Sequence, residues 1–298
     1  MTAPGLDPRV LRARDRYQRV MEGWTDNTHD DALTHTVRLR DDDRAIELAA
    51  IAAPSPAYEI RAARCRVLGG PVAPEVERGV ETLAGARMVA GFARRVAEAT
   101  GSGDGAALVV DAAIEIARLA RQVTKVPRER AERAAGGSAW ECWQLDTTGW
   151  IDLPDSCFTY SSAGRALVAT RTVATPMGPD LYSPRPGQRR VFVRHKLARL
   201  ERGRGRLGLF HSMHDNVHGF EITCEVDLAT GVIVRAEHVT PKLPYMGICS
   251  EPQSKIRSLI GETVDEGLRK RIGILLGGPP GCAQLYDLTA DLLKLLAA

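Results

Sequence analysis

The chain combines stretches with a two-residue hydrophobic period and stretches with a helical period. Residues 35–40 and 45–51 alternate apolar and polar side chains around three aspartates, which predicts a β-hairpin. Residues 220–226 and 232–239 repeat this pattern around a turn that contains Gly231. Each hairpin is followed by a proline-rich crossing and then by helical periodicity. The pattern therefore predicts units of antiparallel sheet followed by helices.

The helical pattern is clearest in the C-terminal part. One apolar stripe should bury against the sheet, and it consists of Ile256, Leu259, Ile260, Val264, Leu268, Ile272 and Leu275. Residues 277–281 are rich in glycine and proline and should end this helix, and residues 282–296 predict a last helix. Upstream, residues 167–173, 190–200 and 206–210 predict further strands.

Two parts of the chain are similar to each other. Residues 82–121 and 258–297 align without a gap at a constant offset of 176, and four glycines coincide: Gly85/Gly261, Gly91/Gly267, Gly101/Gly277 and Gly105/Gly281. A second match lies upstream at an offset of 187, and it pairs Ile46, Ala49, Pro54 and Tyr58 with Ile233, Ala236, Pro241 and Tyr245. We expect an internal duplication.

This repeat sets the expected domain organisation, an α+β fold built from two related units of antiparallel sheet plus helices. The first, degenerate repeat should span residues 1–125, and the second, which carries the expected site, residues 156–298. The joint, 126–155, concentrates three tryptophans: Trp140, Trp143 and Trp150. They either form a hydrophobic plug or stack on a ligand.

Composition limits the possible functions without selecting one. A chain of 298 residues with 44% hydrophobic residues can build two ordinary cores, and a net charge of +3 is too small to indicate nucleic acid or a membrane as partner. The six cysteines lack a C-x-x-C pair, so we expect free thiols and a cytoplasmic, reducing compartment. We expect neither a signal peptide at residues 1–14 nor a membrane span.

Histidines are clustered in the C-terminal part. Four of the seven lie within 28 residues, namely His211, His214, His218 and His238. Imidazole is both a common metal ligand and a natural general base at neutral pH. If Asp215 and Asn216 form a turn, His211 and His218 should face each other across the mouth of a hairpin. The spacing matches no zinc signature, so acid/base chemistry, a divalent metal such as zinc on these four histidines, and a solvated turn all remain open.

Two cysteines form a second candidate group. Cys249 and Cys282 each follow a glycine-containing crossing near the start of a helical segment. A helix N-terminus lowers the pKa of a thiol and raises its reactivity. Packing is the other interpretation, because cysteine is often buried and the first repeat has Ala106 where the second has Cys282.

A third candidate group is basic. The stretch from residue 185 to residue 206 contains nine basic residues and a single acidic one, Glu201. Alternate positions of a strand point to the same side, so Arg190, Arg194 and Lys196 should share a face that suits a carboxylate or a phosphate. A solvated hairpin also explains this run. Nucleic acid is disfavoured, because aromatic residues other than Phe192 are missing from it.

Several short motifs in the second repeat identify a family resemblance. They include His218-Gly-Phe, Val226-Asp227, Pro244-Tyr245 with Cys249, Leu259-Ile-Gly261, and the run from Gly277 to Leu285. Over about residues 156–298 this set resembles the bacterial domain-of-unknown-function 2889 family, whose members show a His-Asp-Met box and a Gly-Cys-Thr-His-Leu box. Here Gly219 and Phe220 replace the Asp and Met, and Ala283 and Gln284 replace the Thr and His. The resemblance implies no settled activity.

A more distant similarity, at the level of topology, is to sulfur-acceptor and iron–sulfur scaffold domains of the SufE/NifU type. These domains also place antiparallel strands before helices, and Cys249 and Cys282 occupy comparable places. The third cysteine that such scaffolds use has no clear match, because Cys224 falls in the middle of a predicted strand. The similarity implies a fold more than an activity.

We expect a cofactor-independent enzyme of small-molecule metabolism, such as a lyase, isomerase or hydrolase, that acts on an anionic or aromatic substrate. Its catalytic residues should come from His218, His211 and His214, with Cys249 as reserve nucleophile. Its substrate contacts should come from Arg190, Arg194, Lys196, Trp143, Trp150 and Tyr245.

The competing hypothesis is a metal or sulfur carrier that uses Cys249, Cys282 and the four clustered histidines. In both cases the expected partner is a small molecule rather than nucleic acid or a membrane. A homo-oligomer is compatible with either hypothesis.

Overall fold

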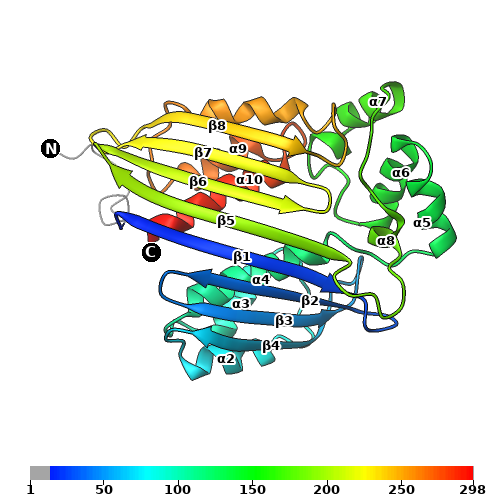
Figure 1. Ribbon diagram of the computed structural model, residues 1–298, viewed down its shortest axis with the longest axis horizontal. Helices are drawn as coiled ribbons and strands as arrows, with labels where there is room; N and C mark the ends of the chain where they lie inside the picture. Colours follow the sequence, from blue (N-terminus) through cyan, green and yellow to red (C-terminus); the bar gives the residue numbers. More distant parts are fainter. Residues whose placement is uncertain (1–13, 298) are drawn as a thin grey trace. The chain divides into compact units, whose positions relative to one another are not determined.

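The computed structural model describes residues 14–297, which contain eight strands and several helices (Figure 1). Residues 1–13, for which we expect no signal peptide, lie outside this range. The strands form one antiparallel sheet in the order β4-β3-β2-β1-β5-β6-β7-β8. The α+β class is therefore confirmed. No helix in the described part is long and apolar enough to cross a membrane.

The strand bounds agree with most of the predicted strands. The strands are β1 (Arg16–Asp26), β2 (Leu33–Asp41), β3 (Ala45–Ala52), β4 (Ile60–Gly69), β5 (Phe192–Gly203), β6 (Arg206–Asp215), β7 (Gly219–Asp227) and β8 (Ile233–Lys242). The pairs β2/β3 and β7/β8 are the two predicted hairpins, and their registers place Val37 opposite Leu48 and Cys224 opposite Ala236.

The α-helices are α2 (Pro74–Glu81), α3 (Phe92–Thr100), α4 (Ala106–Ala120), α5 (Arg128–Ala135), α6 (Ala139–Gly149), α7 (Ser162–Thr170), α8 (Pro179–Tyr182), α9 (Leu268–Leu276) and α10 (Ala283–Leu292). Three 3-10 helices accompany them, η1 (Phe158–Tyr160), η2 (Glu251–Leu259) and η3 (Leu293–Ala297). The predicted last helix is thus α10 followed by η3.

The described chain divides into two compact units, each made from several segments. The C-terminal unit contains residues 14–19, 152–176 and 196–297, and the N-terminal unit contains residues 20–151 and 177–195. Residues 126–151 of the expected joint belong to the N-terminal unit, where they form α5 and α6. In that unit α4 packs on β2 and β3, and α2 packs on β4.

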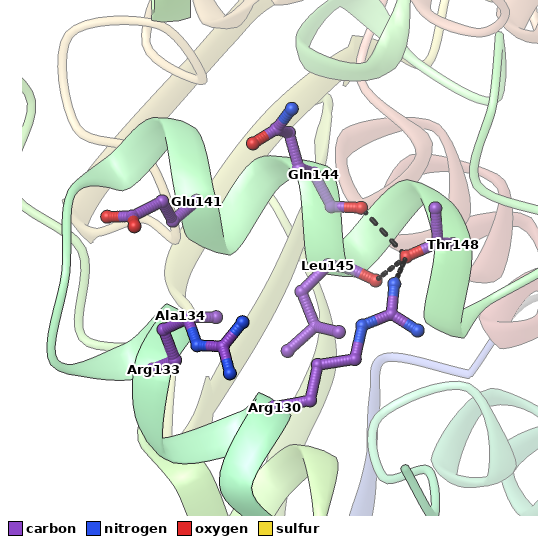
Figure 2. Close-up of a pocket in the computed structure, with 7 residues that line it drawn as sticks. All are labelled: Arg130, Arg133, Ala134, Glu141, Gln144, Leu145 and Thr148. Carbon is purple, nitrogen blue, oxygen red and sulfur yellow. Dashed lines mark hydrogen bonds between the residues drawn. The ribbon is translucent and has the colours of Figure 1, made fainter. Parts of the chain in front are cut away.

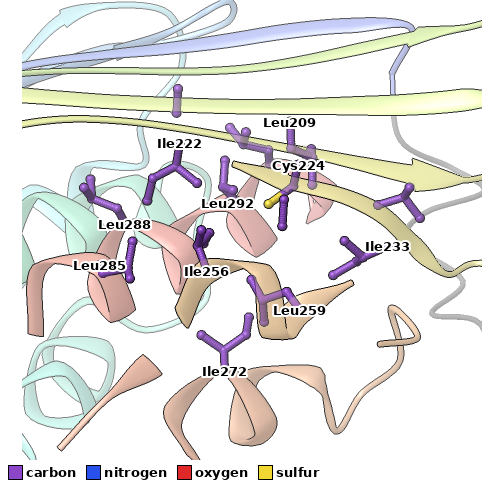
Figure 3. Packing of buried hydrophobic residues seen from close by; sticks show 14 of the residues in the cluster. Leu209, Ile222, Cys224, Ile233, Ile256, Leu259, Ile272, Leu285, Leu288 and Leu292 are labelled. Carbon is purple, nitrogen blue, oxygen red and sulfur yellow. The ribbon is translucent and has the colours of Figure 1, made fainter. Parts of the chain in front are cut away.

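The core of the C-terminal unit lies between its strands and one layer of helices (Figure 3). Leu209, Ile222 and Cys224 project from β6 and β7 toward α10 and η2. The helices contribute fully buried aliphatic side chains, among them Ile256, Leu259, Ile272, Leu285, Leu288 and Leu292. Burial of each such side chain contributes roughly 1.5–3 kcal/mol, so this layer fixes α10 against the sheet.

Two local predictions were wrong. Residues 167–173, predicted as a strand, lie largely in α7, because Ser161 caps a helix there by accepting a hydrogen bond from Gly164 N at 3.2 Å. Short apolar runs do not distinguish a strand from a helix. The single stripe from Ile256 to Leu275 is divided between η2 and α9, and its Ile260 is 49% exposed.

The upstream sequence match joins strands at different places in the chain order. Ile46 lies on β3, the third of the strands β1 to β4. Ile233 is the first residue of β8, the last of the strands β5 to β8. The offset of 187 therefore pairs strands that differ in their place along the chain. Hydrophobic alternation is alike in all strands, so sequence alone does not determine which strands of two repeats would correspond.

Candidate functional site

A tight turn between β6 and β7 holds Asp215 and His218 together. The Asp215 Oδ1 atom accepts hydrogen bonds from the amides of Val217 at 2.8 Å and His218 at 2.6 Å. The Asp215 N–H donates in turn to His218 O at 2.9 Å. An aspartate that accepts hydrogen bonds from the amides two and three residues ahead stabilises such a turn.

The same carboxylate orients the His218 ring. Nδ1 of His218 lies 3.1 Å from Oδ1 and 3.2 Å from Oδ2 of Asp215, whose side chain has no exposed surface. The ring contacts Asp215 through Nδ1, and Nε2 takes no part in these contacts. Lys242, opposite Gly219 on β8, donates from Nζ to Asp215 O at 3.0 Å. The arrangement fixes one ring nitrogen and leaves the other able to exchange a proton.

The other three histidines are not part of this arrangement. His211 lies opposite Ile222 in the middle of β6, is 3% exposed, and has Nδ1 2.9 Å from Leu288 O. The expectation that it faces His218 across the hairpin mouth is therefore wrong. His214 is half exposed and lies 3.7 Å from Glu221. Burial and the nearby Arg257 lower the pKa of His238, which lies on β8.

The predicted basic face is only partly formed. Arg194 and Lys196 both point to the buried side of β5, and Lys196 Nζ lies 3.6 Å from Asp291 Oδ2. Arg190 precedes the strand, pairs with Glu22, and stacks its guanidinium 5.0 Å from the Trp24 ring centre. The alternation along the strand was correct for Arg194 and Lys196, whereas Arg190 does not share their face.

The three aromatic residues expected to contact a substrate are buried and pack against other aromatic rings. Trp143 is 8% exposed and stacks on Trp140 with ring centres 5.2 Å apart. Trp150, 2% exposed, lies 5.4 Å from the Tyr182 ring. Tyr245 has no exposed surface and meets the Tyr160 ring edge-on at 6.3 Å.

Three cysteines of the C-terminal unit, Cys157, Cys249 and Cys282, influence one another electrostatically, where the sequence indicated two. Cys282 is the N-cap of α10 and accepts a hydrogen bond from Leu285 N at 3.5 Å. Cys249 Sγ lies 3.0 Å from Thr159 Oγ1, and Thr159 follows Cys157 by two residues. Burial, with the neighbouring Cys282, raises the pKa of Cys157 to about 11. The neutral thiol is therefore the resting form at pH 7.

Residues 204–297 match a family described as "Protein of unknown function (DUF2889)". The resemblance expected from the sequence is confirmed for this stretch. No curated protein and no solved structure matches the chain.

The stretch that matches DUF2889 contains Asp215, His218, Cys249 and Cys282, but Cys157 lies outside it. Sequence reasoning considered Asp215 only as a turn residue and left Cys157 out. An aspartate three residues before a histidine was an available signal for the first. No local pattern could indicate the second, because it comes from a segment more than 90 residues away from Cys249.

A pocket of about 370 Å³ lies in the N-terminal unit between α5 and α6 (Figure 2). It is lined by Arg130, Arg133, Ala134, Glu141, Gln144, Leu145 and Thr148. Arg130 Nη2 donates to Thr148 Oγ1 at 2.5 Å. None of the predicted site residues lines this pocket. In the described part of the chain, no group of three or more His, Cys, Asp or Glu side chains is arranged to hold a metal ion.

Proposed function

We propose that the protein is an acid/base enzyme of small-molecule metabolism, a lyase, isomerase or hydrolase, in which His218 transfers the proton. The observation that carries this proposal is the pair of contacts from Asp215 to Nδ1 of His218, at 3.1 and 3.2 Å. A carboxylate on Nδ1 selects the tautomer whose Nε2 is a base, and it stabilises the imidazolium that forms when Nε2 accepts a proton.

An anionic substrate fits the surroundings of this pair. The ammonium of Lys242 donates to the carbonyls of Asp215 and Asn216, at 3.0 and 3.4 Å, and adds positive charge beside the turn. The centre of the Phe220 ring lies 6.2 Å from that of the His218 ring, and Phe220 is fully buried in the core behind it. Lys242 therefore takes the anion-holding role that the sequence assigned to the basic face of β5, where Lys196 already pairs with Asp291.

Hydrogen exchange at carbon tests the proposal. The protein would be incubated in D₂O with a panel of small carboxylic acids and phosphate esters, and exchange or turnover would be followed by NMR. We expect one class of compound to react with the unmodified protein and with His214→Asn, whose side chain is half exposed, and to be inert with His218→Asn. Equal reaction with His218→Asn, or an inert panel, would overturn the proposal.

We also propose the internal duplication. In it, the acid/base pair Asp215 and His218 belongs to the second repeat only. Support for the duplication comes from local structure: α3 and α9 have bounds that differ by 176 at both ends. Gly85 N donates to Ile60 O at 2.7 Å, and Gly261 N donates to Ile233 O at 2.9 Å. We infer that β4 corresponds to β8 and that Ile60, rather than Ile46, is the counterpart of Ile233.

A cytoplasmic location remains our proposal. It is supported by the thiols, because all six cysteines lie in the described range and all are free. Free thiols persist in reducing compartments. Cells that produce a tagged, functional protein would be separated into cytoplasmic and periplasmic fractions to test this location. Recovery of the protein in the periplasmic fraction would contradict the proposal.

A further inference from the structure

The three thiols of the C-terminal unit lie on separate segments joined by hydrogen bonds. Phe158 N donates to Gly281 O at 2.8 Å, which brings the segment of Cys157 beside that of Cys282. A Cβ atom at Gly281 would lie 2.0 Å from Leu276 O, so only glycine permits this path of the backbone. Both cysteines have extended backbones, with φ of −157° and −127°. Side chains on neighbouring extended segments can approach as closely as a disulfide requires.

Gln253 connects the third thiol to this pair. Its Nε2 donates to Cys249 O at 2.8 Å; burial raises the pKa of the Cys282 thiol, and the neighbouring Gln253 side chain offsets part of that rise. The residue is 1% exposed, and its Oε1 has no hydrogen-bond partner in the described part of the chain. A buried amide oxygen of this kind can accept a hydrogen bond from a bound molecule or from a thiol.

Packing alone does not require thiols at these positions. In the proposed repeat the counterpart of Cys282 is Ala106, which is 7% exposed and begins α4. The stretch 70–73 before α2, the counterpart of the Cys249 segment, contains no cysteine. The same local fold is thus built elsewhere in the chain without sulfur, and this step rests on the proposed duplication.

The residues that carry the three thiols are partly exposed, although burial raises the pKa of each thiol. Cys157, Cys249 and Cys282 are all partly exposed, whereas Cys142 and Cys224 are buried, at 0% and 3% exposure. Cys65 is partly exposed too, and it lies on β4 of the N-terminal unit, in a different unit from the other partly exposed cysteines. It is therefore a matched control for reactivity.

We propose that Cys157, Cys249 and Cys282 form a thiol–disulfide exchange site that reacts with low-molecular-weight disulfides and closes a Cys157–Cys282 disulfide. Cys282 loses its proton to solvent and attacks one sulfur of the small disulfide RSSR, which releases RS⁻ and forms a mixed disulfide. The thiolate of Cys157 then attacks Cys282 Sγ and releases the second RS⁻. One RSSR is reduced to two thiols, and one pair of protein thiols is oxidised.

The N-cap position supports Cys282 as the attacking group. Leu285 N donates to its sulfur at 3.5 Å, and the helix N-terminus stabilises a developing thiolate. Cys249, held by Thr159, lies beside the pair as a third thiol. The site does not use His218, so it is independent of the proposed acid/base chemistry.

The experiment uses the full chain and glutathione disulfide as the probe. After incubation, free thiols would be blocked with N-ethylmaleimide at low pH, and the protein would be digested and mapped by mass spectrometry. We expect a linked peptide that contains Cys157 and Cys282 and a loss of two thiols per chain, while Cys65 gives at most a mixed disulfide. Cys282→Ala, which introduces the residue found in the first repeat, should abolish the link, while the protein still folds cooperatively with a small loss of stability from the missing N-cap bond.

Cys157→Ser should stop the reaction at the mixed disulfide on Cys282, and His218→Asn should leave the linked peptide unchanged. The proposal would be overturned if Cys157 and Cys282 stayed fully alkylated under conditions that modify Cys65, or if Cys282 were linked to Cys249 instead. A stable persulfide or a stoichiometric metal on these thiols in freshly purified protein would also overturn it, in favour of a carrier.

Discussion

Nδ1 of His218 lies 3.1 Å from Oδ1 of Asp215, a carboxylate whose side chain is fully buried. The same oxygen accepts the amides of Val217 and His218. One group therefore closes the turn and orients the ring, and the two roles can be separated by mutation.

Asp215→Asn should destabilise the protein by roughly 1.5–3 kcal/mol, the usual contribution of a hydrogen bond to a charged group. The amide oxygen of Asn can still accept the turn amides, but the charge that supports the His218 ring is lost. Urea unfolding measures the change. His214→Asn, on the exposed side, should stay within about 0.5 kcal/mol, and equal effects of both variants would contradict the assignment.

His35 predicts a dependence of stability on pH in the N-terminal unit. Its ring is fully buried beside Thr25 Oγ1 at 2.9 Å, and burial lowers its pKa to about 3. In the unfolded chain an imidazole titrates near about 6.5, so between these values the unfolded state binds more protons. Stability should therefore fall as pH drops below about 6.5, by roughly 1.4 kcal/mol per pH unit from this group.

Urea unfolding at several pH values between about 6.5 and 4.5 would measure this slope. His35→Phe removes the titrating group while keeping a ring of similar shape, and it should flatten the slope relative to the unmodified protein. An unchanged slope would show that other groups control acid unfolding.

Lys196 is predicted to be a structural residue rather than a substrate ligand. It is 6% exposed and lies 3.6 Å from Asp291, which also pairs with Lys294 at 2.7 Å. Lys196→Met should destabilise the protein by roughly 1–3 kcal/mol, less than the removal of one partner from an isolated buried pair, because Lys294 still neutralises Asp291.

Thermal unfolding of Lys196→Met would measure this loss. Arg199→Met is the matched control, since Arg199 is exposed on the same strand, and it should have a much smaller effect. If Lys196→Met were as stable as the unmodified protein but lost a ligand, the role in substrate binding would be restored.

Gln253 is predicted to tune the reactivity of Cys282. Burial raises the pKa of Cys282, while hydrogen bonds from Leu285 N and from the Gln253 side chain lower it. Gln253→Leu removes one of these donors, so the pKa of Cys282 should rise further and its alkylation by iodoacetamide at pH 8 should slow several-fold. Peptide mapping of the modified cysteines measures this rate, with Cys65 as the internal reference. Faster alkylation of Cys282 would reverse the assigned role of the amide.

Local features of this protein were determined by its sequence. The two-residue alternation placed β2, β3, β7 and β8, because in a strand each side chain alternates between the two faces. The same alternation along β5 correctly predicted that Arg194 and Lys196 lie on one side of the strand. The glycine-rich run before Cys282 correctly indicated the start of α10, since glycine ends one helix and allows the next to begin.

Only the tertiary structure decided which of these local features meet. It buried His211 under Leu288, left Arg190 outside β5, and made a helix of a run that alternation alone could not assign. It also brought Cys157 beside Cys282 through the contact of Phe158 with Gly281. Periodicity reports the geometry of neighbours along the chain, whereas the proximity of distant residues follows from how strands and helices pack, and no local pattern contains that information.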